Sequence, residues 1–384
     1  MTERNESTRY PIAAVRERVR QHGRPVLDFA VGPHRELPPT ALLDMLRNVD
    51  DWWLRTPCSR DELDAFSDAA AVMLRRIYGV DAPPSAIMPV PGGRTAMSFL
   101  ASTVIRPGDD VAVAEPAYPA FARVAHQIHA RVHSVPLDPE RGFEPAANSL
   151  TAEEAAEVSF VALNYPNNPT GAVISDQALG EFLGRFGPGT IVFNDATYGP
   201  LVFDQPPWSV LAGARSLTDR FRFVELHSLA KLFALGPLSV AFFVGEQGII
   251  AELGEYAEYA WSDQSSLEMK VALTCLEDGD RFDAMRAIYA DRLDRLGVVL
   301  SELGFEPFPA ASGMYIVCRT PSAIGGRPVA DAGEAAVVLL KNHNVAVVPW
   351  EVHPTSYLRF SSQFSEEDLA ALAALGANGP LASP

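Results

Sequence analysis

Four polar residues follow apolar runs of the sequence, and their side chains suit carbonyl chemistry. Asn168 comes shortly after VSFVALN, Asp195 and Tyr198 follow GTIVFN, and Lys231 follows FRFVEL. A lysine amine forms a Schiff base with an aldehyde, and a carboxylate keeps a pyridine nitrogen protonated. Asparagine and tyrosine donors stabilise a phenolate oxygen. Together these residue types indicate a site for a cofactor that carries an aldehyde on a pyridine ring.

Each of these residues also has a simpler explanation when it is taken alone. Lys231 at a strand end can extend its ammonium group to solvent along its aliphatic stem. The segment NNPTG, residues 167–171, has the composition of a turn, and Asp195 suits the N-cap of a helix. Because the coincidence recurs at three strand ends, we favour a shared site.

Short apolar runs rich in β-branched residues alternate with helical patterns over most of the chain. Buried strands are expected at residues 109–116, 158–166, 189–198, 221–229 and 238–245. Helices are expected at residues 118–130 and 175–187, the second with Ser175 as N-cap and Gly187 at its end. This order predicts a mainly parallel sheet with helices on both faces, which binds ligands beyond the carboxyl ends of its strands.

A long helical pattern covers residues 280–304 and is expected to lead into a second, smaller domain. It places five apolar residues on one face, namely Phe282, Met285, Leu293, Leu296 and Leu300. The smaller domain would contain the runs GMYIVCRTP, NVAVVPW and SYLRFSSQF and a helix around AGEAAVVLLKNHN.

Composition excludes several classes of protein. The chain has 384 residues, 48% of them hydrophobic, and a formal net charge of −17, which disfavours nucleic acid as a partner. No window holds 18 uncharged apolar residues, so we expect no membrane span, and the N-terminus lacks the apolar segment of an export signal. Three cysteines without CxxC spacing suit a reducing cytoplasm. The histidines at 126, 129 and 133 are not expected to converge on a metal.

These motifs, in this order, resemble the fold-type I pyridoxal 5'-phosphate enzymes of the class I/II aminotransferase family. The resemblance covers roughly residues 27–364. It implies an α/β fold like that of aspartate aminotransferase, with a mainly parallel seven-stranded sheet and a smaller α+β domain. It also implies an N-terminal arm with part of the small domain at residues 1–45, a large cofactor-binding domain at 46–278 and a small C-terminal domain at 279–384.

The resemblance assigns roles to the cofactor-binding residues. Lys231 would form the Schiff base, Asp195 would pair with the pyridinium nitrogen, and Tyr198 and Asn168 would hydrogen-bond the ring oxygen. Tyr118 would stack on the ring, although it can also be a core residue, as we expect its neighbour Phe121 to be. The phosphate would be bound by a glycine turn at a helix start and one hydroxyl, from Gly92, Gly93, Arg94, Thr95 and Ser228.

Two further residues match positions that bind the substrate in the family. Arg359, in SYLRFSSQF, would receive the substrate's α-carboxylate, because a guanidinium binds carboxylates through two parallel hydrogen bonds. The alternative for Arg359 is a surface salt bridge on a strand. Gly32, in DFAVGPH, lies where the family brings backbone amides over the substrate, and Asn168 would also contact it.

The sequence departs from the family pattern at two places. The family has an arginine that clamps the phosphate about eight residues after the lysine, and Ser239 stands there. We expect Arg94 to replace it, the alternative being that Arg94 points to solvent. The family also carries a tyrosine that reaches the partner's phosphate across a homodimer interface, where this chain has Trp52, Trp53 and Arg55. An aromatic residue or Arg55 takes over that role, or the interface differs.

The expected activity is transamination of an α-amino acid in the cytoplasm by a homodimer. The same groups also support a lyase or a decarboxylating or oxidative deaminase of a specialised pathway, for instance one acting on a cysteine conjugate. A binding or regulatory module that no longer turns over is the remaining alternative, and the presence of Lys231 disfavours it.

Overall fold

The computed structural model of the chain describes residues 11–31, 34–146, 148–236, 238, 240–260, 264–352 and 355–383. The chain divides into two compact units. The large unit comprises Glu36–Asn167 and Ala172–Ala287, and the small unit comprises Met1–Arg35, Asn168–Gly171 and Ile288–Pro384. The segment that carries Asn168 therefore belongs by its contacts to the small unit, although the sequence on both sides of it belongs to the large one.

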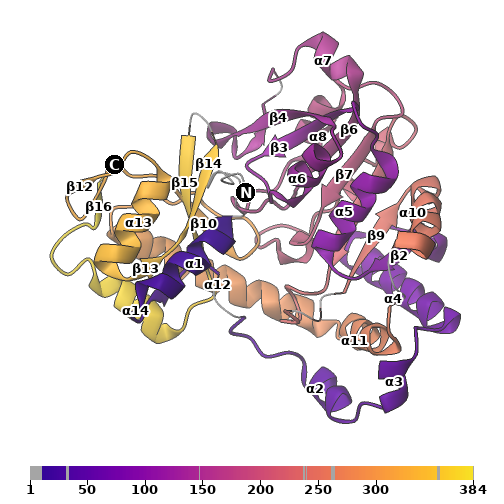
Figure 1. The fold of residues 1–384 in the computed structure, drawn as a ribbon, viewed down its shortest axis with the longest axis horizontal. Helices are drawn as coiled ribbons and strands as arrows, with labels where there is room; N and C mark the ends of the chain where they lie inside the picture. The colour runs from indigo at the N-terminus through magenta and orange to yellow at the C-terminus, as the bar shows by residue number, and fades with distance from the viewer. Residues whose placement is uncertain are drawn as a thin grey trace, which may run out of the picture. The chain divides into compact units, whose positions relative to one another are not determined.

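The large unit contains an eight-stranded sheet in the order β2-β9-β8-β7-β6-β3-β4-β5 (Figure 1). The strands β4, β3, β6, β7 and β8 are parallel, whereas β2, β9 and β5 pair antiparallel. The expected mainly parallel sheet is confirmed, but it has eight strands rather than seven because the short β5 extends its edge. The strands are β2 Ile87–Val90, β3 Asp110–Glu115, β4 Arg131–Asp138, β5 Glu144–Pro145, β6 Val158–Leu163, β7 Ile191–Asp195, β8 Arg222–Ser228 and β9 Ala241–Gly245.

One face of this sheet packs against the helices α5, α6 and α10. Alternate residues of the strands point into this core, because side chains along a strand alternate between faces. Phe193 of β7 and Val224 and Leu226 of β8 belong to it, together with Phe121 of α6. The ring of Phe121 stacks on those of Phe160 and Phe193, so it is a core residue as expected. The alternation leaves Asn194, Glu225 and His227 to point to the opposite face.

Capping residues mark the starts of helices in the large unit. Ser175 caps α8 by accepting a hydrogen bond from Ala178 N, as expected, but the helix ends at Leu183 rather than at Gly187. Bonds from Arg185 N to Phe182 O and from Phe186 N to Leu183 O tighten the chain into turns there. The helices are α2 Thr40–Arg47, α3 Asp51–Arg55, α4 Arg60–Tyr78, α5 Gly93–Val104, α6 Ala120–Gln127, α7 Ala152–Glu157, α8 Asp176–Leu183, α9 Val210–Gly213, α10 Gln247–Ala260 and α11 Ser266–Glu277.

The small unit is built on short antiparallel strands. β15 Thr355–Ser361 pairs with both β10 Tyr315–Arg319 and β14 Val348–Val352. The other strands form two smaller sheets, and helices flank them. These elements are α1 Pro11–His22, β1 Leu27–Asp28, β11 Ala323–Ile324, β12 Arg327–Pro328, α13 Ala332–His343, β13 Val345–Ala346, α14 Glu366–Ala374 and β16 Ala382–Ser383.

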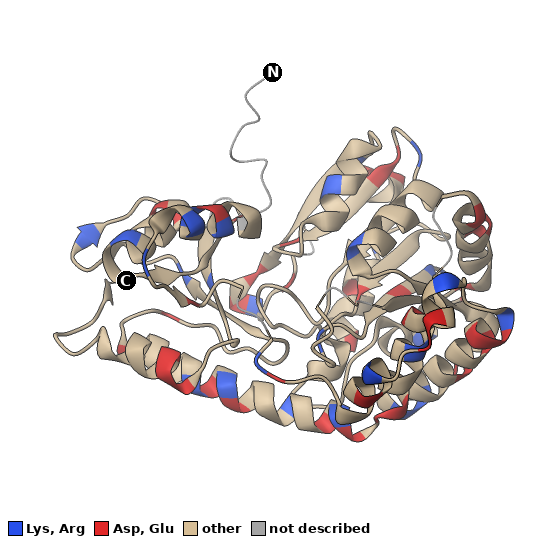
Figure 2. Ribbon diagram, turned by 60° about the horizontal axis from the view of Figure 1, so that its bottom comes forward, with Lys and Arg blue, Asp and Glu red and all other residues tan. Residues whose placement is uncertain are grey.

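Helix α12, Asp280–Glu302, runs from the large unit into the small unit. The five apolar residues predicted on one face of this helix are all buried. Basic and acidic side chains are interspersed along the helices of the chain (Figure 2). No helix within the described residues is both long and apolar enough to span a bilayer.

Candidate active site

Three neighbouring parallel strands of the large unit end in polar residues. β6 leads into Asn164, β7 ends at Asp195, and β8 ends at Ser228, with Lys231 three positions further on. Parallel strands place their carboxyl ends at one edge of the sheet. The structure therefore brings Asp195, Ser228 and Lys231 to the same edge.

Asp195 is a buried carboxylate with one oxygen occupied. Its Oδ1 accepts hydrogen bonds from Thr197 N at 3.1 Å and Thr197 Oγ1 at 2.6 Å, so it closes a local turn rather than capping an α-helix. Its Oδ2 accepts no hydrogen bond from any described residue. Burial raises the pKa of Asp195, while the two bonds from Thr197 and then the positive charges of His227 and Lys231 act in the opposite direction.

Lys231 lies on a tight turn that follows β8. The turn is closed by hydrogen bonds from Phe233 N to Leu229 O and from Leu235 N to Ala230 O. The Lys231 side chain is partly exposed and makes no hydrogen bond or ion pair with the described residues. Ser239, the position that departs from the family pattern, lies outside the described residues.

An arginine for which the sequence predicts no role contacts this turn. Arg281, at the start of α12, donates from Nε to the carbonyl of Leu232 at 3.1 Å and from a terminal nitrogen to the carbonyl of Leu37 at 2.7 Å. The guanidinium therefore fixes the residue next to Lys231. This contact could not be predicted, because residues 232 and 281 are far apart in the sequence and no local pattern links them.

The start of α5 is a suitable site for an anion. Its N-cap is Gly92, with a φ of 93°, and no side chain caps the first turn. A Cβ on Gly93 would lie 3.7 Å from Leu226 Cδ2, so this turn lies beside β8. The side chains of Arg94 and Thr95 are exposed, and Arg94 has no ion-pair partner in the described part of the chain. Free N–H groups at a helix start attract phosphate.

Tyr118 and Tyr198 lie in loops at the same edge. Tyr118 follows β3, and its backbone N donates to Asn164 Oδ1 at 3.2 Å. Asn164 Nδ2 donates to the carbonyl of Asp195 at 2.9 Å and so joins the ends of β6 and β7. Tyr198 is buried, three residues after Asp195. Both tyrosines are predicted from the sequence, but Asn164 is not, because it lies inside the predicted strand 158–166, whereas β6 ends one residue before it.

In the small unit, Arg359 is buried, and no acidic side chain among the described residues pairs with it. Its side chain is 1% exposed, and Nε has no hydrogen-bond partner. One terminal nitrogen donates to Asn168 Oδ1 at 3.1 Å and the other to the carbonyl of Ala30 at 3.2 Å. The guanidinium lies 3.8 Å from the ring centre of Tyr315. The alternative of a surface salt bridge for Arg359 is therefore wrong.

The turn that carries Asn168 depends on a glycine. Gly171, with a φ of 71°, ends the turn that carries Asn168, and a Cβ there would lie 2.8 Å from both Ala310 Cβ and Ser312 O. The turn therefore requires glycine. Gly32 lies outside the described residues.

Comparison with known proteins identifies the class. The sequence model of the family described as aminotransferase class I and II matches residues 55–374. The chain therefore belongs to this family and is an enzyme of the transferase class.

Individual relatives agree with this assignment. An LL-diaminopimelate aminotransferase of Methanocaldococcus jannaschii is 27% identical over 89% of this chain and 82% of its own length. An L-glutamine--4-(methylsulfanyl)-2-oxobutanoate aminotransferase of Bacillus subtilis is 27% identical over 90% of this chain and 87% of its own. These names favour transamination over the elimination and deamination reactions that the sequence left open.

Solved structures share the fold. The substrate-bound structure of BacF from Bacillus subtilis superimposes with a TM-score of 0.85 at 23% identity and covers 97% of this chain and 96% of its own. An aspartate aminotransferase double mutant of Thermus thermophilus superimposes with a TM-score of 0.81 at 21% identity, covering 97% of each chain. The aspartate-aminotransferase-like fold is thus confirmed.

Proposed function

We propose that this enzyme is a pyridoxal 5'-phosphate-dependent aminotransferase that acts on an α-amino acid through Lys231. The observation that carries the proposal is Asp195, a buried carboxylate whose Oδ2 accepts no hydrogen bond from the described residues. A buried carboxylate is costly unless it is paired. The pyridinium nitrogen of the cofactor would supply that missing partner.

Other polar groups fit the remaining parts of the cofactor. The uncapped first turn of α5 suits the phosphate, and Ser228 adds a hydroxyl. Tyr198 and Asn168 are the donors for the ring oxygen, and the ring of Tyr118 is the stacking partner. When bound, pyridoxal phosphate acts as an electron sink for the substrate's α-carbon. Lys231 Nζ is the basic group that takes the proton from that carbon.

Arg359 is our candidate for the substrate's α-carboxylate. A buried guanidinium with a vacant Nε and no acidic neighbour among the described residues has capacity for one more charged acceptor. Its hydrogen bond to Asn168 would couple the substrate's carboxylate to the cofactor's ring oxygen. Gly32 is the proposed backbone contact on the substrate.

In the family an arginine binds the cofactor phosphate at the position that Ser239 occupies in this chain. Arg94 is our candidate to replace it. Its exposed side chain starts at the second residue of α5, and no described residue pairs with its charge. A guanidinium there would add a charge-assisted hydrogen bond to the phosphate.

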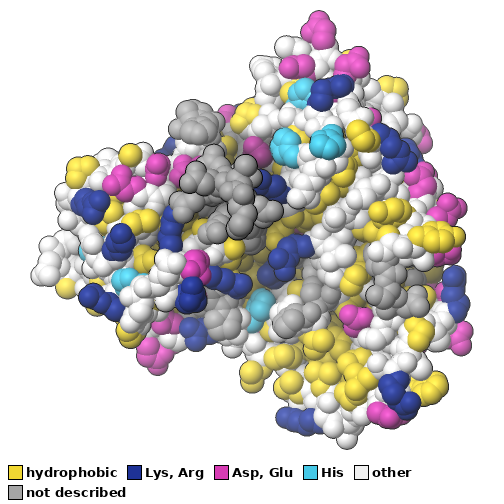
Figure 3. All heavy atoms as spheres, in the orientation of Figure 1, with side chains coloured by type: hydrophobic (Ala, Val, Ile, Leu, Met, Phe, Trp, Pro, Cys, Tyr) yellow, Lys and Arg dark blue, Asp and Glu magenta, His cyan; other side chains and the backbone are white. Residues whose placement is uncertain are grey.

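We further propose a homodimer in the cytoplasm. The side chains of Leu37, Trp52 and Leu54 are between 60% and 74% exposed, and apolar side chains gather over α2 and α3 at the bottom of Figure 3. Such a patch marks an interface, and Arg55, which lies 5.7 Å from the Trp52 ring, adds a charge at its rim. Replacing Trp52 and Leu54 with glutamate should shift the sedimentation of the protein from dimer to monomer. An unchanged dimer would place the interface elsewhere.

The thiols support the cytoplasmic location. Cys275 and Cys318 are buried and form no disulfide, and burial raises the pKa of Cys275 to about 12. Both are therefore inert thiols, which is usual in a reducing compartment.

The cofactor assignment is tested by trapping the covalent link. The protein is loaded with pyridoxal phosphate, reduced with sodium borohydride and digested, and the modified peptide is identified by mass spectrometry. We expect the cofactor mass on Lys231, and no visible absorbance band with Lys231→Ala. Modification of Lys270 or Lys341 instead of Lys231 would contradict the assignment.

A further inference from the structure

Asn164 lies where β6 and β7 separate, and its side chain bridges two segments of the large unit. The last paired residues of the two strands are Leu163 and Asn194. Beyond that pair, the carbonyl of Asp195 accepts a hydrogen bond from Asn164 Nδ2 at 2.9 Å. Tyr165 N, the next backbone donor of this segment, is bonded instead to the side chain of Asn194 at 2.8 Å. A side-chain amide therefore takes the place of a backbone N–H at this strand end.

The other end of the same amide holds the loop that follows β3. Asn164 Oδ1 accepts a hydrogen bond from Tyr118 N at 3.2 Å. Asn167 ties the two segments a second time, because its Nδ2 donates to the carbonyl of Pro116 at 2.9 Å and to that of Asn164 at 3.2 Å. Only one orientation of the Asn164 amide fits these partners, since a carbonyl needs a donor and an N–H needs an acceptor.

Asn164 lies on the same face of the sheet as Asp195. Ala162 of β6 belongs to the core that packs against α5, and Asn164, two residues further on, continues the alternation. Phe193 of β7 belongs to the same core, and Asp195 follows it by two residues. The Tyr118 side chain is partly buried and packs against this core. Asn164 therefore joins two residues that occupy one side of the sheet edge.

The bond to the Asp195 carbonyl is costly to lose because both residues are buried. Asn164 is 4% exposed and Asp195 5% exposed, and a buried carbonyl without a donor destabilises the folded state. The carbonyl and the carboxylate of Asp195 are carried by the same Cα, so a peptide group that turns toward another donor also turns the carboxylate. Thr197 bonds the carboxylate itself, at Oδ1. Asn164 thus fixes the backbone from which the Asp195 side chain extends.

We propose that Asn164 is a positioning residue of the cofactor site, whose amide holds Asp195 and Tyr118 at a fixed spacing. This inference rests on the proposed function, in which Asp195 pairs with the cofactor's ring nitrogen and Tyr118 stacks on its ring. The spacing matters because both residues must meet the same flat ring, one at its edge and the other on its face. Asn164 acts on cofactor binding only through these two residues.

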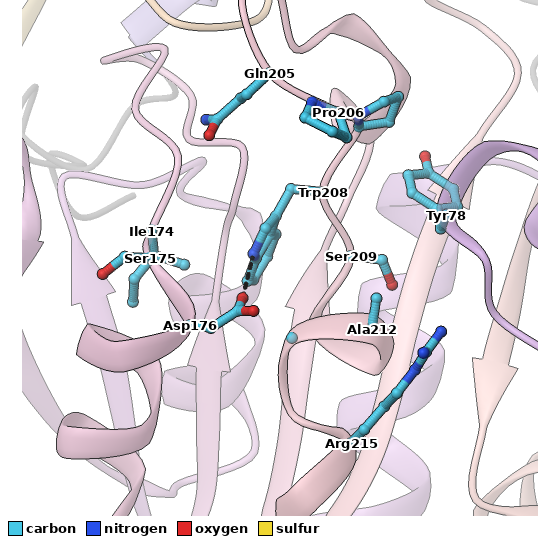
Figure 4. A pocket seen from close by; sticks show the side chains of 12 residues that line it. Tyr78, Ile174, Ser175, Asp176, Gln205, Pro206, Trp208, Ser209, Ala212 and Arg215 are labelled. Atoms are coloured by element: carbon cyan, nitrogen blue, oxygen red, sulfur yellow. Dashed lines mark hydrogen bonds between the residues drawn. The ribbon is translucent and has the colours of Figure 1, made fainter.

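Matched controls lie on the opposite face of the sheet. Asn194 is also a buried amide at a strand end, and its Nδ2 donates to Tyr165 O and to Glu225 Oε1, both at 2.8 Å. Glu225 accepts a further bond from Ser209 Oγ. Ser209 lines a pocket of about 480 Å³ together with Trp208 (Figure 4). Replacing Asn194 or Ser209 therefore disturbs the same strand ends without removing a bond that Asn164 makes.

The test compares Asn164→Ala with wild type and with the two controls, Asn194→Ala and Ser209→Ala. The probes are pyridoxal phosphate and its 1-deaza analogue, in which a C–H replaces the ring nitrogen. The dissociation constant of each probe is measured with each apoprotein, and thermal unfolding is recorded in parallel. Asn164→Ala is also combined with Tyr118→Leu, which removes the stacking ring and keeps the backbone N–H. Asn164→Ser takes the place of Asn164→Ala if the latter does not fold.

We expect Asn164→Ala to weaken pyridoxal phosphate binding about tenfold, which is the effect of losing a single hydrogen bond to a charged group. The loss should be at least about threefold smaller with the deaza analogue, because this probe has no ring nitrogen for Asp195. The remaining loss, which acts through Tyr118, should disappear when Tyr118→Leu is present. Each control should weaken the binding of both probes by the same factor and should lower the melting temperature.

Equal losses with both probes for Asn164→Ala, or no loss with pyridoxal phosphate, would overturn the inference and leave Asn164 a purely structural residue. A loss with the deaza analogue that persists beside Tyr118→Leu, or a control that changes the ratio of the two dissociation constants as much as Asn164→Ala, would overturn it as well. Failure of the wild-type protein to bind pyridoxal phosphate, or its equal affinity for the two probes, would overturn the proposed function instead.

Discussion

The guanidinium of Arg359 donates a hydrogen bond of 3.1 Å to Asn168 Oδ1, and both side chains are buried in the small unit. Asn168 sits on a short turn between two segments of the large unit, so this bond joins residues that are 191 positions apart. An arginine in this setting, without a carboxylate among the described residues, is poised for a ligand's carboxylate rather than for a structural salt bridge.

Replacing Arg359 with methionine should separate function from stability. The variant removes an unpaired buried charge and keeps much of the apolar stem, so its melting temperature should equal or exceed that of wild type. Loss of a charged hydrogen-bond donor should lower kcat/KM about 10- to 100-fold for a substrate with a free α-carboxylate. Steady-state kinetics with the amino acid and with its methyl ester check this. An equal loss with the ester would contradict the assignment.

Replacing Asp195 with asparagine should have opposite effects on the apoprotein and on cofactor binding. Burial raises the pKa of Asp195, so the folded state holds the proton more tightly than the unfolded state. The free energy of unfolding of the apoprotein therefore falls as the pH rises above about 3.9, the pKa of an aspartate in the unfolded chain. This fall is complete once the pH exceeds the raised pKa of Asp195 in the folded state. Asparagine does not ionise, so Asp195→Asn does not show this fall.

The apo variant should thus be at least as stable as wild type at neutral pH, with the difference vanishing in acid, and it should bind pyridoxal phosphate at least about tenfold more weakly. Urea unfolding across pH and a cofactor titration measure the two effects. If the variant were less stable than wild type at neutral pH but not in acid, the predicted direction of the stability difference would be contradicted.

Replacing Arg94 with alanine should weaken binding of pyridoxal phosphate but not of pyridoxal. The side chain would contact only the phosphate, through a charge-assisted bond worth about 1.5 to 3 kcal/mol, or roughly 10- to 150-fold in affinity. Absorbance titrations with both aldehydes measure this. Arg47→Ala is the control, since Arg47 is exposed and its only ion pair within the described part of the chain is with Asp44 on its own helix. Unchanged affinity for pyridoxal phosphate would mean that Arg94 points to solvent.

Replacing Gly171 with alanine should destabilise the turn that carries Asn168. The backbone has a φ of 71°, and the new Cβ would lie 2.8 Å from backbone and side-chain atoms. The cost should be about 2 to 4 kcal/mol, the sum of left-handed strain and overpacking. Gly326→Ala in the same unit has a φ of 75° and nothing within 4 Å, so it should cost only about 1 to 2 kcal/mol. Chemical unfolding compares them, and equal costs would show that the close contacts relax freely.

The sequence predicted the parts of the fold that depend on local pattern. The apolar runs ending at Asn164, Asp195 and Ser228 are strands of one sheet, and the apolar face of α12 is buried, because burial on a strand or helix face leaves a periodic signal. The two-residue β5 was missed because so short an edge strand has no periodicity.

The parts of the site that depend on tertiary contacts could not be predicted. Arg281 reaches the carbonyl next to Lys231 from across the fold, and the turn of Asn168 joins the small unit through Arg359 and Ser312. The buried contact between His227 and Glu225 did have a sequence signal, since FRFVELHS places two ionisable residues two positions apart in an apolar strand. Ser209, which donates to the Glu225 carboxylate, had none, because a single serine in a loop does not indicate what it contacts.

The central claim is that the enzyme transfers an amino group by means of pyridoxal phosphate. It is tested most directly by mixing the cofactor-loaded protein with a panel of α-amino acids, without an oxo-acid acceptor, and identifying all products by mass spectrometry. The account predicts stoichiometric pyridoxamine phosphate together with the oxo acid of at least one amino acid, and neither product with Lys231→Ala. Ammonia, a free thiol or carbon dioxide, formed while the cofactor remains pyridoxal phosphate, would contradict it.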